Sequence, residues 1–294
     1  MDTRPAGRRS RSSRMVLALL SLACALPAWA AERLVWAGSP YAPMAIASGP
    51  LKGQGYVDRM IAEVLQPGLP QFRHEQMQVS PNRLELELLR TDIAVCSPAM
   101  SKAPQRLERY RYTQPLFRFL PAGVVLRREQ ALRSGPGPLA LQQLLAQGLR
   151  FGVVGYRAYG PRVDALLERH EAQRQRFILS QSNQAVLAML ARGHGVDAVL
   201  VYGFELRHFA LEQPELGAEL VWRPLQELDD TQLSYTACSR NPAGERVARA
   251  IDALLQQPGV RERLQGLYEA WLDEDGQRQL QALRQRLGAQ FWQE

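Results

Sequence analysis

Short apolar segments alternate with segments of helical spacing along most of the chain. Parallel strands need long crossover connections, which are usually helices, so this alternation predicts βαβ units and an α/β fold. In the first half, strands are expected at 34–37, 72–79 and 92–96, with helices at 56–65 and 80–90. In the second half, strands are expected at 122–126, 151–154, around 178 and at 196–201, with helices at 139–146, 161–169 and 183–192. Further helical segments are expected at 247–255 and 260–287.

The length and composition agree with this reading. A chain of 294 residues has room for two ordinary domains or one large α/β domain. Hydrophobic residues make up 46% of it, which excludes a generally disordered chain. No apolar run reaches the roughly 18 to 20 residues that cross a bilayer, which excludes a polytopic membrane protein.

Residues 1–30 have the three parts of a secretory signal peptide. A basic segment comes first, an apolar run follows at 15–26, and Ala-Trp-Ala at 28–30 places small residues where a signal peptidase reads them. We therefore expect cleavage after Ala30 and export to the periplasm. A buried N-terminal helix is the alternative, and Pro27 directly after the apolar run argues against it. Lipoprotein and twin-arginine export signals are weaker alternatives.

The positive charge of the chain is concentrated in this N-terminal segment. Five arginines and one acidic residue lie within residues 1–30, so their removal would lower the net charge from +7 to +3. A nucleic-acid-binding surface needs basic residues gathered on the folded domain. We therefore expect no nucleic-acid partner.

Two cysteines, Cys96 and Cys238, are left once Cys24 is removed with the signal peptide. An even number in an oxidising compartment favours a disulfide. Each cysteine ends a short apolar segment and is followed by serine. Two unrelated buried thiols are the alternative.

Four short motifs follow one another along the exported part of the chain. They are Tyr-Ala-Pro-Met at 41–44, Gly-Gln-Gly-Tyr at 53–56, the segment 99–106 with Tyr-Thr-Gln-Pro at 112–115, and the segment 190–198. Together they resemble the motifs of bacterial extracellular solute-binding protein family 3, and the resemblance spans nearly the whole exported chain.

The resemblance implies the type II fold of periplasmic binding proteins. This fold has two lobes, each a mostly parallel sheet flanked by helices, joined by two crossing hinge strands. Lobe one would comprise 32–118 and 233–294, and lobe two 119–232. A ligand would sit in the cleft, with the lobes closing over it. The two cysteines would then lie on neighbouring strands of lobe one, which favours their pairing.

Three residues match family positions that hold a ligand. Arg106 matches the arginine that receives the ligand's carboxylate, a task suited to a planar guanidinium with two parallel donors. Ser101 matches the position that supplies a hydroxyl beside it, and Tyr41 matches the aromatic residue that flanks the ligand. A surface arginine and a plain loop tyrosine are the alternative interpretations.

Other positions depart from the family pattern. The carboxylate that takes an amino acid's ammonium group is expected five residues after Asp197, where this chain has Tyr202. The acidic position of the first helix is Arg59, with Asp58 adjacent, and Glu205 could substitute only if its loop bends. The sequence thus predicts a site that keeps its anion-binding half and loses its cation-binding half. A carboxylate-bearing ligand is favoured over a zwitterionic amino acid.

The loop at 155–160 is a second candidate surface. It follows an expected strand and precedes a helix, so its backbone N–H groups could point at an anion. Tyr156 and Tyr159 could stack on a ligand ring, and Arg157 lies between them. A loop packed on its own lobe is the alternative.

The overall prediction is a periplasmic solute-binding protein, expected to be a monomer, that captures a small ligand for an ABC-type importer. A sensor acting in trans on a membrane receptor is the alternative. A dehydratase-like enzyme is a weaker one, based on Glu205 and His208, which a solvated helix face explains equally well. The four histidines are scattered, so no metal site and no cofactor are expected.

Overall fold

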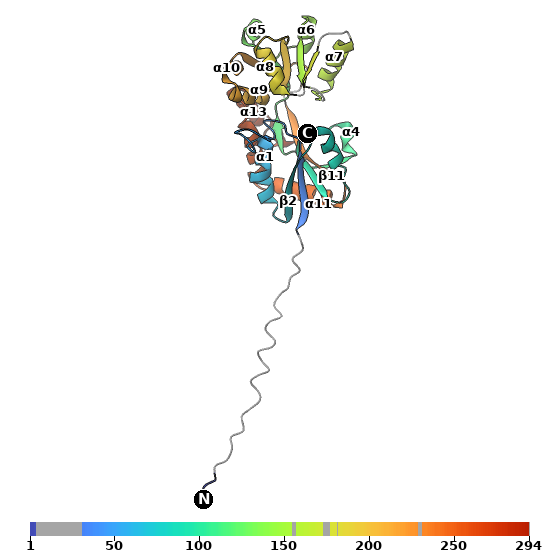
Figure 1. Cartoon of the computed structure of the whole chain (residues 1–294), viewed down its shortest axis with the longest axis vertical. Helices are drawn as coiled ribbons and strands as arrows, with labels where there is room; N and C mark the ends of the chain where they lie inside the picture. The colour runs from blue at the N-terminus through green and yellow to red at the C-terminus, as the bar shows by residue number, and fades with distance from the viewer. Residues whose placement is uncertain (4–30, 155–156, 173–176, 181, 229–230, 294) are drawn as a thin grey trace.

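A computed structural model describes residues 1–3, 31–154, 157–172, 177–180, 182–228 and 231–293. The predicted signal peptide and its cleavage site lie outside these residues, apart from the first three. Two β-sheets occupy separate halves of the molecule, one above the other in Figure 1. Within the described residues, no helix is both long and apolar enough to cross a membrane.

The first sheet has the strand order β2-β1-β3-β11-β4, with β5 also paired to β11. Strands β1, β2 and β3 are parallel, whereas β4 and β5 are antiparallel to β11, and β11 is antiparallel to β3. The bounds are β1 (Glu32–Gly38), β2 (Phe72–Gln78), β3 (Ala94–Met100), β4 (Tyr110–Tyr112), β5 (Phe117–Phe119) and β11 (Gln232–Ser239).

Both faces of this sheet are buried. Leu34 and Trp36 point into one apolar cluster, while Val35 and Ala37 point into another on the opposite face. A strand covered on both faces reads as a continuous apolar run, which is why the sequence predicts it well. The helices beside this sheet are α1 (Tyr56–Met60), the π-helix η1 (Ile61–Leu65), α2 (Gln66–Gly68), α3 (Pro81–Glu87), α4 (Pro104–Leu107), α11 (Pro242–Leu255), α12 (Val260–Glu269), α13 (Glu274–Leu287) and the 3-10 helix η2 (Gly288–Trp292).

The second sheet has the order β10-β6-β9-β7-β8, parallel for β7, β8 and β9 and antiparallel at β6 and β10. Its strands are β6 (Ala122–Arg127), β7 (Phe151–Val154), β8 (Phe177–Ser180), β9 (Ala198–Tyr202) and β10 (Leu220–Pro224). Its helices are α5 (Arg128–Arg133), α6 (Leu141–Ala146), α7 (Pro161–Ala172), α8 (Asn183–Ala191), α9 (Gly203–Glu212) and α10 (Pro214–Ala218).

We call the first sheet with its helices lobe one, and the second sheet with its helices lobe two. The chain passes from the first sheet to the second between β5 and β6, and returns between β10 and β11. The boundaries 118/119 and 232/233 stay a prediction.

Helix α9 of lobe two reaches into the core of lobe one. Phe204 is buried there, edge-on to Tyr56 and Tyr268 with ring centroids 5.7 and 5.9 Å away. One turn further, His208 lies 5.8 Å from Trp271. The two lobes therefore share an apolar contact at the base of α9.

Cys96 and Cys238 are joined by a disulfide, as expected. They face each other directly on the antiparallel strands β3 and β11, and both are fully buried in the core of lobe one. The helical segment expected at 260–287 is interrupted, because Asp273 caps a new helix by accepting a hydrogen bond from the Gly276 N–H at 2.8 Å.

Candidate functional site

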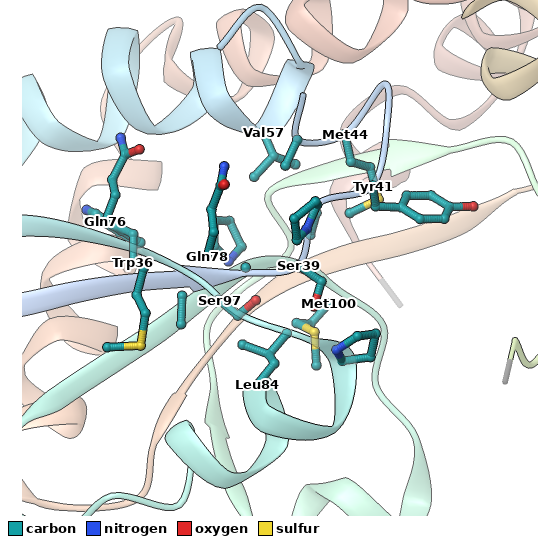
Figure 2. Close-up of a pocket in the computed structure, with 18 of the residues that line it drawn as sticks. Trp36, Ser39, Tyr41, Met44, Val57, Gln76, Gln78, Leu84, Ser97 and Met100 are labelled. Carbon is teal, nitrogen blue, oxygen red and sulfur yellow. The ribbon is translucent and has the colours of Figure 1, made fainter. Parts of the chain in front are cut away.

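A cavity of about 380 Å³ lies at the carboxyl ends of the parallel strands β1, β2 and β3. Ligands of open α/β sheets bind at this edge, because the connections that follow the strands can be varied without disturbing the sheet. We call it the lobe-one cavity, and Figure 2 shows part of its lining. The lining includes Trp36, Ser39, Tyr41, Met44, Val57, Gln76, Met77, Gln78, Asn82, Leu84, Glu85, Ser97, Met100 and Arg106.

The lining combines apolar side chains with neutral polar groups and the charged side chains of Asp58, Glu85 and Arg106. Three methionines, Met44, Met77 and Met100, adapt their shape to what they contact, since the side chain is unbranched and polarizable. The amides of Gln76 and Gln78 can each donate and accept hydrogen bonds. Such a lining suits a small organic molecule with an apolar body and one polar head.

Arg106 of α4 lies at the wall of this cavity, where it pairs with an acidic residue. Its Nη2 donates to Glu85 Oε1 at 2.7 Å, and Arg109 Nη1 donates to Glu85 Oε2 at 3.2 Å. One carboxylate is thus shared by two guanidinium groups, which leaves the trio with a net charge of +1. The Arg106 side chain remains one-third exposed, so it retains surface toward solvent.

Ser101 is not brought to this wall. Its side chain is exposed, it is absent from the cavity lining, and its carbonyl accepts the Tyr112 hydroxyl at 3.4 Å. Ala99, two residues earlier, does line the cavity and has a φ of 61°. This left-handed conformation costs a non-glycine residue about 1 kcal/mol or more, and such strain often marks a functional segment.

The loop that carries Tyr41 is fixed against helix α1. The Val57 N–H donates to the Met44 carbonyl at 2.9 Å. Gly55 permits this close approach, because a Cβ there would stand 2.3 Å from the Met44 oxygen. The Tyr41 ring extends away from the other labelled side chains in Figure 2, and its hydroxyl is buried without a partner among the described residues.

Of the two candidates in the first helix, Asp58 lines the lobe-one cavity and Arg59 does not. Asp58 accepts hydrogen bonds from the N–H groups of Ile46 and Gly55 at 2.9 and 3.2 Å, so it ties the 41–55 loop to α1. Burial raises the pKa of Asp58, and these two hydrogen bonds oppose the shift. Arg59 pairs with Glu63 one turn along the helix.

A second cluster lies where the two lobes meet, and we call it the interlobe niche. Arg157 makes a two-toothed ion pair with Glu205, with N–O distances of 2.9 and 2.8 Å. The Arg157 side chain is 10% exposed and Glu205 is fully buried. The guanidinium carbon lies 5.0 Å from the ring centroid of Tyr41 and 5.3 Å from that of Tyr202. Asn183 completes the niche by donating to Glu205 Oε1 at 3.0 Å.

The niche follows from the topology of lobe two. Arg157 comes after β7, Asn183 after β8, and Tyr202 ends β9, so three neighbouring parallel strands deliver these residues to one edge. Glu205 lies in the first turn of α9 and also accepts the Tyr202 N–H at 2.8 Å. Burial raises the pKa of the Glu205 carboxyl well above its usual value, and the same burial lowers the pKa of Arg157.

The structure corrects four interpretations. Tyr159 is a core residue of lobe two: its hydroxyl accepts the Val154 N–H and donates to the Leu200 carbonyl, and its ring centroid lies 5.8 Å from the Arg157 guanidinium carbon. The N–H groups of Tyr159 and Gly160 donate to Asp164 and not to an anion. Tyr156 lies outside the described residues.

The third correction concerns the face of α9. Glu205 and His208 are both buried, so a solvated helix face does not explain them. The fourth concerns Glu205, which needs no bent loop, because the first turn of α9 carries its carboxylate to the lobe boundary. At that boundary the Glu205 carboxylate is paired with Arg157 of the same chain.

No protein-family model matches the chain, and no curated protein matches it. Solved structures do match. The ytmK probable amino-acid ABC transporter extracellular-binding protein from Bacillus subtilis is 16% identical, with a TM-score of 0.59 over 82% of this chain and 98% of that one. A histidine kinase sensor domain with similarity to periplasmic binding proteins is 20% identical, with a TM-score of 0.56 over 82% and 96%. The BvgS VFT2 domain from Bordetella pertussis is 15% identical, with a TM-score of 0.56 over 82% and 92%.

At these identities the likeness shows the fold. The expected two-lobe α/β fold is thereby confirmed, and the sheet of each lobe combines parallel and antiparallel strands.

Proposed function

We propose that this protein is an exported solute-binding protein that takes a small carboxylate-bearing molecule into the lobe-one cavity. The observation that carries the proposal is Arg106, the cation at the wall of a largely apolar cavity. The shared Glu85 leaves one positive charge there without a counter-ion within the trio. A ligand carboxylate supplies that counter-ion, and the apolar lining takes its body.

The partners follow from the same proposal. An ABC-type importer would receive the ligand, and several solved structures of this fold are described as amino-acid ABC transporter proteins. The protein would act as a monomer in the periplasm after cleavage at Ala30. The proposal includes no enzymatic step and no cofactor.

A sensory role in trans is the second candidate, favoured by a specific observation. Phe204 and Arg157 hold the lobes in contact through side chains of the chain itself. A protein that presents a closed form to a membrane receptor needs such contacts. The matching histidine kinase sensor domain has the same fold.

The first test is a thermal-shift screen of carboxylates, amino acids, peptides and sugars, followed by calorimetry with the best ligand. Arg106→Ala removes both donors of a charged pair, which costs about 2 to 5 kcal/mol. This corresponds to a roughly 30- to several-thousand-fold loss of affinity. Arg106→Lys should recover part of it, because a point charge cannot reproduce the two-toothed geometry.

Arg109→Ala is the matched control. Arg109 contacts the same Glu85 but does not line the cavity. Its removal keeps the Arg106 donors but leaves Glu85 to neutralise Arg106, so the affinity should fall less than in Arg106→Ala. Equal affinity of Arg106→Ala and wild type, with both folded, would show that Arg106 is surface charge only. If the protein is a sensor, it should bind its ligand but should not co-purify with a permease. Co-purification with a membrane receptor would favour the sensory role.

A further inference from the structure

Arg157 has the surroundings of a bound guanidinium ligand. Its two terminal nitrogens each donate to one oxygen of Glu205, the geometry in which arginine and a carboxylate recognise each other most specifically. Its guanidinium carbon lies 5.0 to 5.3 Å from the ring centroids of Tyr41 and Tyr202, within the range of a cation–π contact. The side chain is nine-tenths buried.

We infer that the interlobe niche is a guanidinium-binding site that this chain fills with its own Arg157. The niche is formed by Tyr41 of lobe one and by Tyr202, Glu205 and Asn183 of lobe two. Tyr202, Glu205 and Asn183 each make contacts with residues other than Arg157. Tyr202 stacks on Phe204 at 5.0 Å, and Glu205 is held by the Tyr202 N–H and by Asn183.

The filled niche joins the two lobes. The Asn183 amide donates both to Glu205 Oε1 at 3.0 Å and to the Ala42 carbonyl of lobe one at 3.4 Å. Tyr41, next to Ala42, covers the guanidinium from the lobe-one side. The 41–45 loop of lobe one is therefore held against lobe two by an occupant that needs no solute.

Two consequences follow from this inference. Free guanidinium compounds do not bind the wild-type niche, because it is already occupied. Removal of the Arg157 side chain opens a space of guanidinium size that retains its carboxylate and its aromatic walls. Methylguanidinium, which reproduces the head group of Arg157, then binds in trans.

The test compares the full chain with Arg157→Ala in thermal-shift and calorimetric titrations with methylguanidinium. Arg157→Ala should melt below wild type, since a buried carboxylate loses its partner. Methylguanidinium at ten times its Kd should raise that melting temperature by about 3 to 6 °C. Wild type should show no saturable shift. Methylammonium should give a smaller shift, because it lacks the paired donors.

Arg150→Ala is the matched control variant. Arg150 also forms a two-toothed pair, with Asp197 in lobe two, but it is 42% exposed and lies outside the niche. It should gain no methylguanidinium binding. The double variant Arg157→Ala with Glu205→Gln removes the unpaired charge, so it should fold even if the single variant does not, and it should bind no methylguanidinium.

Hydrogen exchange supplies the readout of lobe contact. Amides of the 41–45 loop should exchange faster in Arg157→Ala than in wild type, and methylguanidinium should slow them again. No binding by a folded Arg157→Ala, or equal binding by the double variant, would overturn the inference. The carboxylate screen of the lobe-one cavity uses different probes, so failure of either proposal is recognised separately.

Discussion

The disulfide between Cys96 and Cys238 allows a quantitative prediction. The two residues are 142 positions apart, so the bond closes nearly half of the chain into a loop. On the chain-entropy relation, closing a loop of this length in the unfolded state stabilises the fold by about 5 kcal/mol. For a protein of this size that corresponds to a melting temperature roughly 10 to 20 °C higher than without the bond.

The assay is urea unfolding of the wild type with and without reductant, alongside Cys96→Ala/Cys238→Ala. Alkylation followed by mass spectrometry of the peptides establishes the thiol state in each sample. The reduced wild type and the double variant should both unfold at lower urea, and reductant should not change the double variant further. A reduced wild type with verified free thiols and an unchanged midpoint would refute the loop-closure reasoning.

Three more predictions concern the lobe contact and the buried polar groups. Phe204→Ala should destabilise by about 3 to 5 kcal/mol in calorimetry, because it leaves a cavity in the lobe-one core, whereas Leu211→Ala on the exposed side of the same helix should cost less than about 1 kcal/mol. Tyr159→Phe should lower the free energy of unfolding in urea by about 1 to 3 kcal/mol, since the buried Val154 N–H loses its acceptor. An unchanged free energy of unfolding would mean that this N–H is in contact with water. Burial lowers the pKa of His208, so the unfolded state binds more protons below its ordinary value of 6.5, and stability should fall as the pH drops from about 7 to 5. His208→Gln should flatten that slope, and an equal slope in both proteins would assign it to other groups.

The strands that the sequence predicts well are those buried on both faces. The segments at 34–37, 122–126 and 151–154 are continuous apolar runs because helices cover each side of their sheet. Strands β4 and β5 are three residues long, and their aromatic side chains alternate with arginines, which leaves too little pattern to recognise. The bounds of helix α9 were not predicted, because both its faces are partly covered, one by lobe one and one by α8 and α10.

The candidate site shows the same contrast: contacts within one motif can be predicted from the sequence, whereas contacts between distant segments cannot. Arg106 lies within a motif that marks it as a candidate, and the structure places it at the wall of the lobe-one cavity. The partners that decide its surroundings, Glu85 and Arg109, belong to no motif. The loop that contains Tyr159 has the composition of a binding loop, yet the Tyr159 hydroxyl forms hydrogen bonds with two strands of its own sheet. Composition cannot separate a stacking tyrosine from a structural one, because both need an apolar face and a polar tip.

The interlobe niche shows why counting along the chain favoured Tyr202 over Glu205. Five residues after Asp197 the chain reaches Tyr202, where β9 ends and α9 begins. The next helical turn returns Glu205 to the side of Tyr202, where it accepts the Tyr202 N–H and meets the lobe boundary. Counting along the chain treats each position separately, whereas residues three apart in an α-helix are neighbours on its surface. The occupant is harder still to foresee, since Arg157 is 48 residues from Glu205 and becomes its partner only through the parallel pairing of β7 and β9.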